Sequence, residues 1–168
     1  MRGCPSEIRR ANPTLGTQAA PIECMKTIVV GLDASPRSPA VLRSALTLAE
    51  RFGAKLFIVR AAPLPPEIPL EALTPAPDSL PVRLAEITQS ALDRAIANVP
   101  HGVLLGAEAR IGAAWQVICD AANERNAELV VVGTHGFSGL DRVLGTTAAK
   151  VVNHASCSVF VVREEIEG

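Results

Sequence analysis

Aromatic residues are scarce in this chain: they make up 3% of its 168 residues, and tyrosine is absent. Proteins that bind single-stranded nucleic acids stack the bases on aromatic side chains, so the composition does not fit that class. An excess of charge is also lacking, since 16 basic and 17 acidic residues leave a net charge of −1. We therefore do not expect a basic surface that binds phosphate backbones.

Long hydrophobic runs are missing as well, because the apolar segments span only a few residues, against roughly 20 for a membrane span. The four cysteines contain no C-x-x-C pair; they are Cys4, Cys24, Cys119 and Cys157. Such a scatter is typical of reduced, mostly buried thiols in a cytosolic protein. We therefore expect a cytoplasmic protein without a membrane contact.

Hydrophobic residues, in contrast, are plentiful. They make up 48% of the sequence, and the length is that of one domain with a continuous core. Residues 1–24 show neither hydrophobic periodicity nor the apolar stretch of a secretory signal. We expect them to be a disordered leader, or an extension from an upstream start with Met25 as the true first residue. Residues 25–168 are expected to form the domain.

Strand and helix patterns alternate along this domain. Short apolar, β-branched segments predict buried strands at 26–32, 55–62, 103–110, 128–133 and 157–163. Helical spacing of apolar residues predicts helices that begin at Pro36, Leu84, Trp115 and Thr146, the first capped by Ser35 and closed by Gly53. Seven of the thirteen prolines lie in residues 63–81, which predicts an irregular segment there.

This alternation predicts the α/β class. Strands that are apolar on both faces and separated by helices favour an open parallel five-stranded sheet with helices on both faces, a Rossmann-like fold. Right-handed crossovers favour the strand order 3-2-1-4-5. The first and fourth strands are then neighbours at the switch point where ligands bind, so Asp33 and Gly133 fall beside one crevice.

A glycine-rich stretch follows the fourth strand, with Gly133, Gly136 and Gly145 ahead of Thr146 and Thr147. Glycines let backbone N–H groups converge, and a helix N-terminus adds free donors and partial positive charge. The stretch therefore suits an anion such as a phosphate chain. Two roles stay open for several of these residues: the glycines could simply permit a tight turn, and Thr146 could be a plain N-cap. Asp33 could likewise be a turn residue.

Generic nucleotide motifs are absent, since neither G-x-x-x-x-G-K-[ST] nor a G-x-G-x-x-G after the first strand occurs. The chain instead resembles the universal stress protein family, whose nucleotide-binding members carry G-x-x-G, about nine residues and then G-[ST]. Gly133-Thr134-His135-Gly136 matches the first part and Gly145-Thr146 the second. VVGLDAS, AERFGAKLFIV, AELVVVGTHG, AAKVVNHA and VFVVR extend the resemblance over residues 25–163. Only eight residues separate Gly136 from Gly145, one fewer than usual.

The resemblance implies a nucleotide site with roles for individual residues. Asp33 would lie near the adenosine, Ala61 would line the adenine pocket, and Val132 and Gly133 would flank the ribose. Backbone N–H groups around Gly136 would wrap the phosphates of ATP, ADP or AMP. The terminal phosphate would be held by Gly145, Thr146 and Thr147. Mg²⁺ would come with the nucleotide, since this ion is coordinated largely by phosphate oxygens and waters. The histidines are not spaced as metal ligands, so we expect no separate metal site.

The resemblance therefore implies an ATP-binding protein of stress response and signalling, with the nucleotide at the carboxyl ends of the first and fourth strands. It also implies a homodimer paired through the terminal strand, 157–163. Catalysis is not expected beyond slow ATP hydrolysis, because no residue pair is placed to activate water. The alternative is a dimeric interaction module of the same fold that binds no nucleotide. An adenylate-forming transferase is less favoured, since H-x-G-H and S-G-G-x-D-S are absent.

Overall fold

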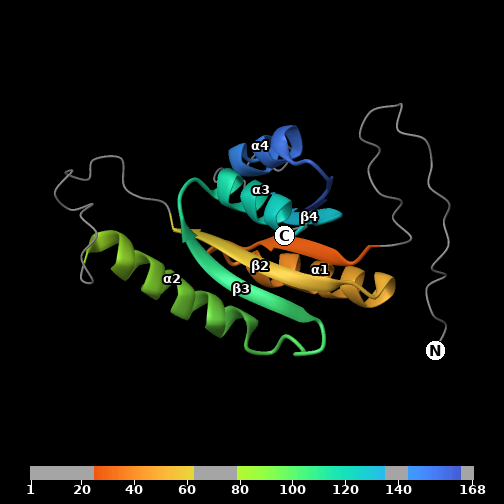
Figure 1. The fold of residues 1–168 in the computed structure, drawn as a ribbon, viewed down its shortest axis with the longest axis horizontal. Coiled ribbons are helices and arrows are strands. Elements are labelled where there is room, and N and C mark those ends of the chain that lie inside the picture. Colours follow the sequence, from red (N-terminus) through yellow and green to blue (C-terminus); the bar gives the residue numbers. More distant parts are fainter. Residues whose placement is uncertain (1–24, 63–78, 135–143, 164–168) are drawn as a thin grey trace, which may run out of the picture.

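The computed structural model describes residues 25–62, 79–134 and 144–163. Strands and helices alternate along them, as Figure 1 shows. The elements are β1 (Thr27–Gly31), α1 (Ser38–Phe52), β2 (Lys55–Ala62), α2 (Leu80–Ile96), β3 (Leu104–Ile111), α3 (Ala114–Glu124), β4 (Leu129–Gly133), α4 (Thr146–His154) and β5 (Ser158–Val162). The five strands are parallel in the order β3-β2-β1-β4-β5, which confirms the predicted fold class and strand order.

Helices cover both faces of the sheet, and each face has its own hydrophobic cluster. Side chains alternate along β1 and β2, so Ile28 and Ile58 pack with α1 and α2 while Val29 and Val59 pack with α3 and α4. All four are at most 1% exposed. The inner strands are therefore buried on both faces, as the apolar runs predicted.

The two outer strands depart from that prediction. β3 is only partly buried along most of its length, and it carries Glu108 and Arg110. β5 is also partly exposed, with Phe160 at 42%. Each lies at an end of the order of the described strands, so only one side of it pairs with another of these strands. The expectation that every strand is apolar on both faces is therefore wrong for β3 and holds only in part for β5.

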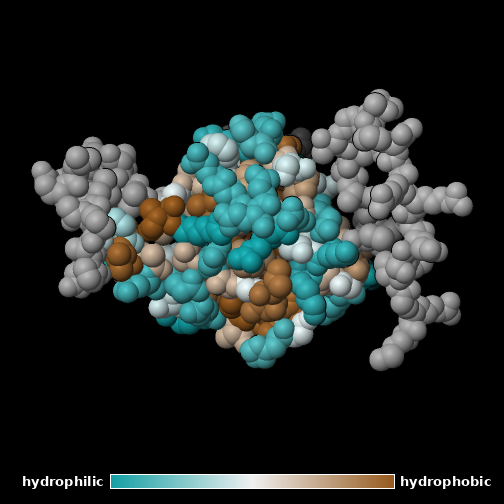
Figure 2. All heavy atoms as spheres, viewed as in Figure 1, coloured by the Kyte–Doolittle hydropathy of each residue, from teal (hydrophilic) through white to brown (hydrophobic). Residues whose placement is uncertain are grey.

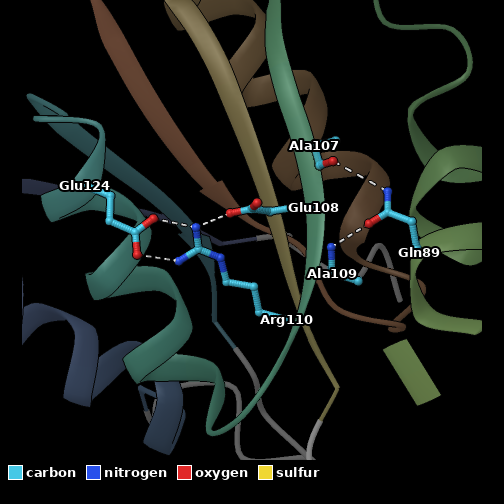
Figure 3. A network of polar contacts seen from close by, with 6 residues as sticks. All are labelled: Gln89, Ala107, Glu108, Ala109, Arg110 and Glu124. Carbon is cyan, nitrogen blue, oxygen red and sulfur yellow. Dashed lines mark hydrogen bonds and ion pairs between the residues drawn. The ribbon is translucent and has the colours of Figure 1, made fainter. Parts of the chain in front are cut away.

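Arg110 joins β3 to α3 through an ion-pair network (Figure 3). Its guanidinium donates to both carboxylate oxygens of Glu124, at 2.9 and 2.5 Å, and also contacts Glu108 on its own strand. The hydrogen bond from Arg110 holds the pKa of the Glu124 carboxyl below its ordinary value. The network covers the edge strand with charge in place of apolar side chains.

The start of α1 differs from the prediction. The helix begins at Ser38 and not at Pro36, because Asp33 organises the preceding residues as a turn. Its Oδ1 accepts hydrogen bonds from the Ser35 N–H at 2.9 Å and from the Ser38 hydroxyl at 2.7 Å. The other end is as predicted: Gly53 takes a left-handed conformation, with φ of 67°, and donates to the carbonyl of Ala49.

α2 begins four residues earlier than Leu84, at Leu80, with Pro81 in its first turn. Proline is well tolerated there because the first turn needs no N–H donor. The prediction of an irregular segment over 63–81 is therefore wrong at its end, and residues 63–78 lie outside the described part of the chain. The expectations for residues 1–24 lie outside it too.

The other elements either keep their predicted bounds or shift by one or two residues. α4 and β2 have the predicted bounds, whereas β3 begins one residue later and β5 is shorter at both ends. α3 starts one residue earlier and ends two residues earlier than expected, at Glu124, and Asn126 then adopts a φ of 48°. A left-handed residue cannot continue a helix, which accounts for the earlier end.

Candidate functional site

A cavity of about 470 Å³ opens at the carboxyl ends of β1, β2 and β4, within the range of ligand pockets. The turn before α1, residues of α2 and the beginnings of α3 and α4 complete its lining. In Figure 1 the carboxyl end of β2 and the beginning of α2 lie together at the left of the molecule. The cavity therefore occupies the switch point at which β1 and β4 are neighbours.

Most of the predicted site residues meet at this cavity. Asp33, Ala61, Val132, Gly133 and Thr147 all line it. They come from four separate segments of the chain, so the fold brings them together. Two others are described but do not line the cavity, namely Gly145 and Thr146. Gly136 lies outside the described residues.

Asp33 has a structural role within the turn. Beyond the contacts of its side chain with Ser35 and Ser38, its backbone carbonyl accepts a hydrogen bond from the Ser38 hydroxyl at 2.7 Å. The carboxylate is partly buried and still lines the cavity. Asp33 is thus both the turn residue and a wall of the cavity, so the two roles considered for it from the sequence are compatible.

Gly31 and Gly133 line the cavity at positions where an added Cβ would crowd a neighbouring side chain. A Cβ at Gly133 would lie 2.9 Å from Cγ2 of Val41, and one at Gly31 would lie 2.5 Å from Cδ1 of Ile118. Both distances are shorter than real carbon contacts. These glycines allow α1 and α3 to approach the carboxyl ends of β1 and β4 closely.

The beginning of α4 corrects one interpretation of the threonines. Gly145 occupies the N-cap position and Thr146 is the first helical residue, exposed to solvent. Thr146 is therefore not the N-cap. Thr147, one residue further, is the residue of this helix start that lines the cavity.

Two arginines line the cavity and were not predicted from the sequence: Arg37 and Arg60. Nη1 of Arg37 lies 3.5 Å from the carbonyl oxygen of Thr134, just beyond β4. Arg60 interrupts the otherwise apolar carboxyl half of β2. A charged residue inside an apolar strand was a usable signal, since such a group has to reach solvent or an anion.

Helix α2 also contributes residues to the cavity, although the sequence indicated none. Leu84, Ile87, Thr88 and Ala91 line it. Three of them are apolar and recur at helical spacing, as core residues of a helix do, but Ile87 is 66% exposed. Figure 2 shows hydrophobic residues exposed at this end of the molecule. The apolar stripe of α2 thus serves the core at its C-terminal half and the cavity nearer its start, a distinction that periodicity cannot make.

Next to the cavity, an aromatic contact joins α3 to α4. The ring of Trp115 lies 4.8 Å from that of His154, and Nζ of Lys150 lies 5.7 Å from the centre of the indole. Trp115 is partly buried and packs against the hydrophobic cluster on this face of the sheet. Lys150 is exposed, and its ammonium group lies over the indole of Trp115.

In the described ranges, no group of three or more His, Cys, Asp or Glu side chains is arranged to hold a metal ion. None of the helices in these ranges combines the length and the apolar character needed to cross a membrane. Cys119 and Cys157 are free thiols, the first buried and the second partly so.

Comparison with family models assigns the chain to a family. The model of the universal stress protein family matches residues 25–163. The chain belongs to the universal stress protein family. This confirms the resemblance that the glycine stretch and the surrounding segments indicated.

Individual universal stress proteins are similar over most of the chain. Universal stress protein A homolog 1 of Coxiella burnetii is 30% identical over 147 residues, covering 82% of this chain and 95% of the relative. Universal stress protein MJ0531 of Methanocaldococcus jannaschii is 30% identical over 141 residues, covering 83% and 82%. Among solved structures, a universal stress protein in complex with cAMP is 26% identical, with a TM-score of 0.59 and coverage of 84% and 99%.

Proposed function

We propose that this universal stress protein binds an adenine nucleotide, with ATP as the leading candidate, and that the bound nucleotide acts as a signal in a cytoplasmic stress response. One observation carries the proposal: Asp33, Ala61, Val132, Gly133 and Thr147, from four separate segments, line a single cavity at the switch point. A similar protein was solved in complex with cAMP, which supports an adenine nucleotide as ligand. The free thiols of Cys119 and Cys157 suit a reducing compartment.

The nucleoside and the phosphates take different ends of the site in this proposal. Asp33 and Ala61 contact the adenosine, and Val132 and Gly133 flank the ribose. The phosphates extend past Gly133 toward the glycine stretch, where small residues permit close backbone approach. Gly136, Gly145, Thr146 and Thr147 bind them, although Gly145 and Thr146 do not line the cavity. We therefore expect the nucleoside end to contribute most of the affinity.

Magnesium accompanies the nucleotide in this proposal. Mg²⁺ keeps several of its waters and leans on phosphate oxygens, so it needs few protein ligands. The protein releases the nucleotide mostly unchanged in this proposal. Hydrolysis needs a group positioned to activate water, and the sequence places no residue pair for that role. ATP turnover is then slow compared with dissociation.

Calorimetric titration with Mg-ATP, ADP and AMP tests the proposal. Gly136→Asp places a carboxylate in the proposed phosphate cradle, and we expect it to weaken ATP binding at least about tenfold through charge repulsion and crowding. Gly102→Asp is the matched control, because Gly102 has open space around a Cβ and no positive φ. If the wild-type chain binds no adenine nucleotide, the proposal is wrong. If Gly136→Asp binds ATP normally, the glycine stretch is not part of the site.

A second candidate function is a dimeric interaction module that binds no nucleotide. The exposure of β5 favours a protein contact: this strand ends the sheet order and carries Phe160 at 42% exposure. We propose a homodimer through β5 under both candidates. A thermal shift separates them, because a ligand at a hundred times its Kd stabilises the folded state by about 2.7 kcal/mol. An unchanged melting temperature with every adenine nucleotide would favour the module.

A further inference from the structure

Arg37 places a positive charge at an unfavourable position in the fold. It occupies the N-cap position of α1 without forming a side-chain cap hydrogen bond, and the first turn of the helix holds no acidic residue. A helix N-terminus carries a partial positive charge, so a cation there lowers the stability of the helix. Short polar side chains are the preferred N-caps. The needs of the helix therefore do not explain an arginine at this position.

The guanidinium of Arg37 is bonded only weakly to the protein. Its hydrogen bond among the described residues joins Nη1 to the carbonyl oxygen of Thr134, at 3.5 Å. That distance is longer than is usual for an N–H···O hydrogen bond, and the acceptor is uncharged. The ion pairs found in the described ranges belong to Arg110 and not to Arg37. Because the side chain is partly buried and lines the cavity, its remaining donors can serve a ligand there.

The charges around the cavity also favour an anion. Among the described residues, the charged side chains of the lining are those of Asp33, Arg37 and Arg60. Arginine stays protonated in proteins, so two cations accompany one carboxyl group. Most of the other lining residues are apolar, and charges interact more strongly where less water screens them. An anionic group bound beside Arg37 would therefore be stabilised.

Arg37 lies where the phosphate chain of a bound nucleotide would begin. The proposed function puts the ribose against Val132 and Gly133 and leads the phosphates past Gly133 toward the glycine stretch. Thr134 is the next residue on this path, and its carbonyl oxygen is the atom that Arg37 contacts. One residue advances an extended chain by only about 3.3 Å. The guanidinium is therefore placed for the phosphate next to the ribose and not for the terminal one.

We propose that Arg37 binds the 5′-phosphate next to the ribose and makes the site selective for nucleotides over nucleosides. This inference rests on the proposed nucleotide function and names the residue that recognises the first phosphate. Arginine suits the role because its planar guanidinium can donate two parallel hydrogen bonds to phosphate oxygens. The bound phosphate would also offset the unfavourable charge at the start of α1. The glycine stretch and Thr147 remain the partners of the phosphates further from the ribose.

Calorimetric titration of the full chain with adenosine, AMP, ADP and Mg-ATP tests the proposal. Arg37→Gln should weaken the binding of all three nucleotides by a similar factor of about tenfold, as for the loss of a charge-assisted hydrogen bond. The affinity for adenosine should change less than about twofold, because adenosine carries no phosphate. Arg37→Lys keeps the charge without the planar fork, so it should restore part of the lost affinity.

Arg51→Gln is the matched control, because Arg51 lies in the last turn of the same helix, is exposed and does not line the cavity. It should leave the affinities for all four ligands unchanged. Thermal unfolding without ligand adds a second readout, since the two arginines lie at opposite ends of the helix dipole. Arg37→Gln should keep or raise the melting temperature, whereas Arg51→Gln should lower it slightly. A lower melting temperature of Arg37→Gln without a selective loss of nucleotides would overturn the proposal in favour of a structural contact with Thr134.

The outcomes separate this inference from the proposed function. Equal losses of adenosine and AMP affinity in Arg37→Gln, or an unchanged AMP affinity, overturn the role of Arg37 and leave nucleotide binding standing. A loss that grows from AMP to ATP also overturns it, because Arg37 would then act on the distal phosphates. A wild-type chain that binds none of the four ligands overturns both proposals. A similar loss for the three nucleotides, with the adenosine affinity maintained, supports the role of Arg37.

Discussion

The side chain of Gln89 bonds to the backbone of β3 as another strand would. Its Oε1 accepts a hydrogen bond from the Ala109 N–H at 2.7 Å, and its Nε2 lies 3.5 Å from the carbonyl oxygen of Ala107 (Figure 3). Nε2 also donates to Asp93 at 2.8 Å. Helix α2 thus forms a wall of the cavity and also covers the outer edge of the sheet. An edge strand with its backbone groups bonded in this way is protected from pairing with another chain.

Replacing Gln89 by leucine should therefore destabilise the protein. The Ala109 N–H would lose its partner beneath an apolar side chain, which costs about 1–2 kcal/mol. Urea unfolding measures the change. Gln116→Leu is the matched control, because Gln116 is exposed on α3 and no hydrogen bond of its side chain is found among the described residues. If both variants unfold at the same urea concentration, the contact with β3 contributes no stability.

The close approach of Gly133 and Val41 predicts a coupled pair. Gly133→Ala should destabilise by about 1–3 kcal/mol through overpacking, because its new Cβ would lie 2.9 Å from Val41 Cγ2. Val41→Ala removes that methyl group, so it should relieve the strain in the double variant. Urea unfolding of both single variants and the double variant gives the interaction energy, expected to be about 1 kcal/mol.

Additive effects in this double-mutant cycle would contradict the close approach of α1 to the end of β4. Gly102→Ala is the control for the glycine substitution, since nothing lies within 4 Å of a Cβ there. That variant should leave stability unchanged or raise it slightly by restricting the unfolded chain.

Trp115 offers a direct signal for ligand binding. It is the one tryptophan of the chain, follows Ala114 in the cavity wall and contacts His154 and Lys150 of α4. A nucleotide that binds to Thr147 at the start of α4 should shift this helix against the indole. We expect the tryptophan emission to change with the same Kd that calorimetry gives. Saturation with ATP without any change in emission would show that α4 does not move.

The sequence predicted the fold better than the walls of the cavity, for a physical reason. β2 and α4 have the predicted bounds because local propensity and periodicity decide them. The start of α1 was misplaced, since Asp33 bonds to residues of the turn and delays the helix, a competition between side chain and backbone. The role of Ile87 was not predictable, because helical spacing shows an apolar stripe but not what covers it. Only the packing of α2 against β2 and β3 turns that stripe toward the cavity.

The two described cysteines predict a dependence of stability on alkaline pH. Burial raises the pKa of the Cys119 thiol, with a further contribution from Asp120. Burial, followed by Cys119 and Glu128, raises the pKa of the Cys157 thiol. Unfolded thiols ionise near a pKa of about 8.5, before the native ones. The free energy of unfolding should therefore be unaffected below that pH and fall as the pH rises through the native values.

Urea unfolding between pH 7 and 10 measures this fall, in a background of Cys4→Ser and Cys24→Ser. Cys119→Ala should flatten the slope with pH even if it lowers stability throughout, because the slope depends on the titrating group and not on packing. Iodoacetamide should also modify the native thiols more slowly than those of the unfolded chain. An unchanged slope in Cys119→Ala would assign the pH dependence to other groups.

The contrast between the two sheet edges predicts how copies of the chain associate. The edge of β3 is bonded to Gln89, whereas β5 ends the sheet on the other side and exposes Phe160. Association through β5 would bury that ring, so Phe160→Asp should raise the dimer Kd at least about tenfold. Light scattering coupled to size exclusion measures the mass at several concentrations. Phe52→Asp, at 38% exposure on α1, is the control and should leave the dimer intact. A dimer that survives Phe160→Asp but not Phe52→Asp would place the contact on α1, and the open edge of β5 would then need another partner.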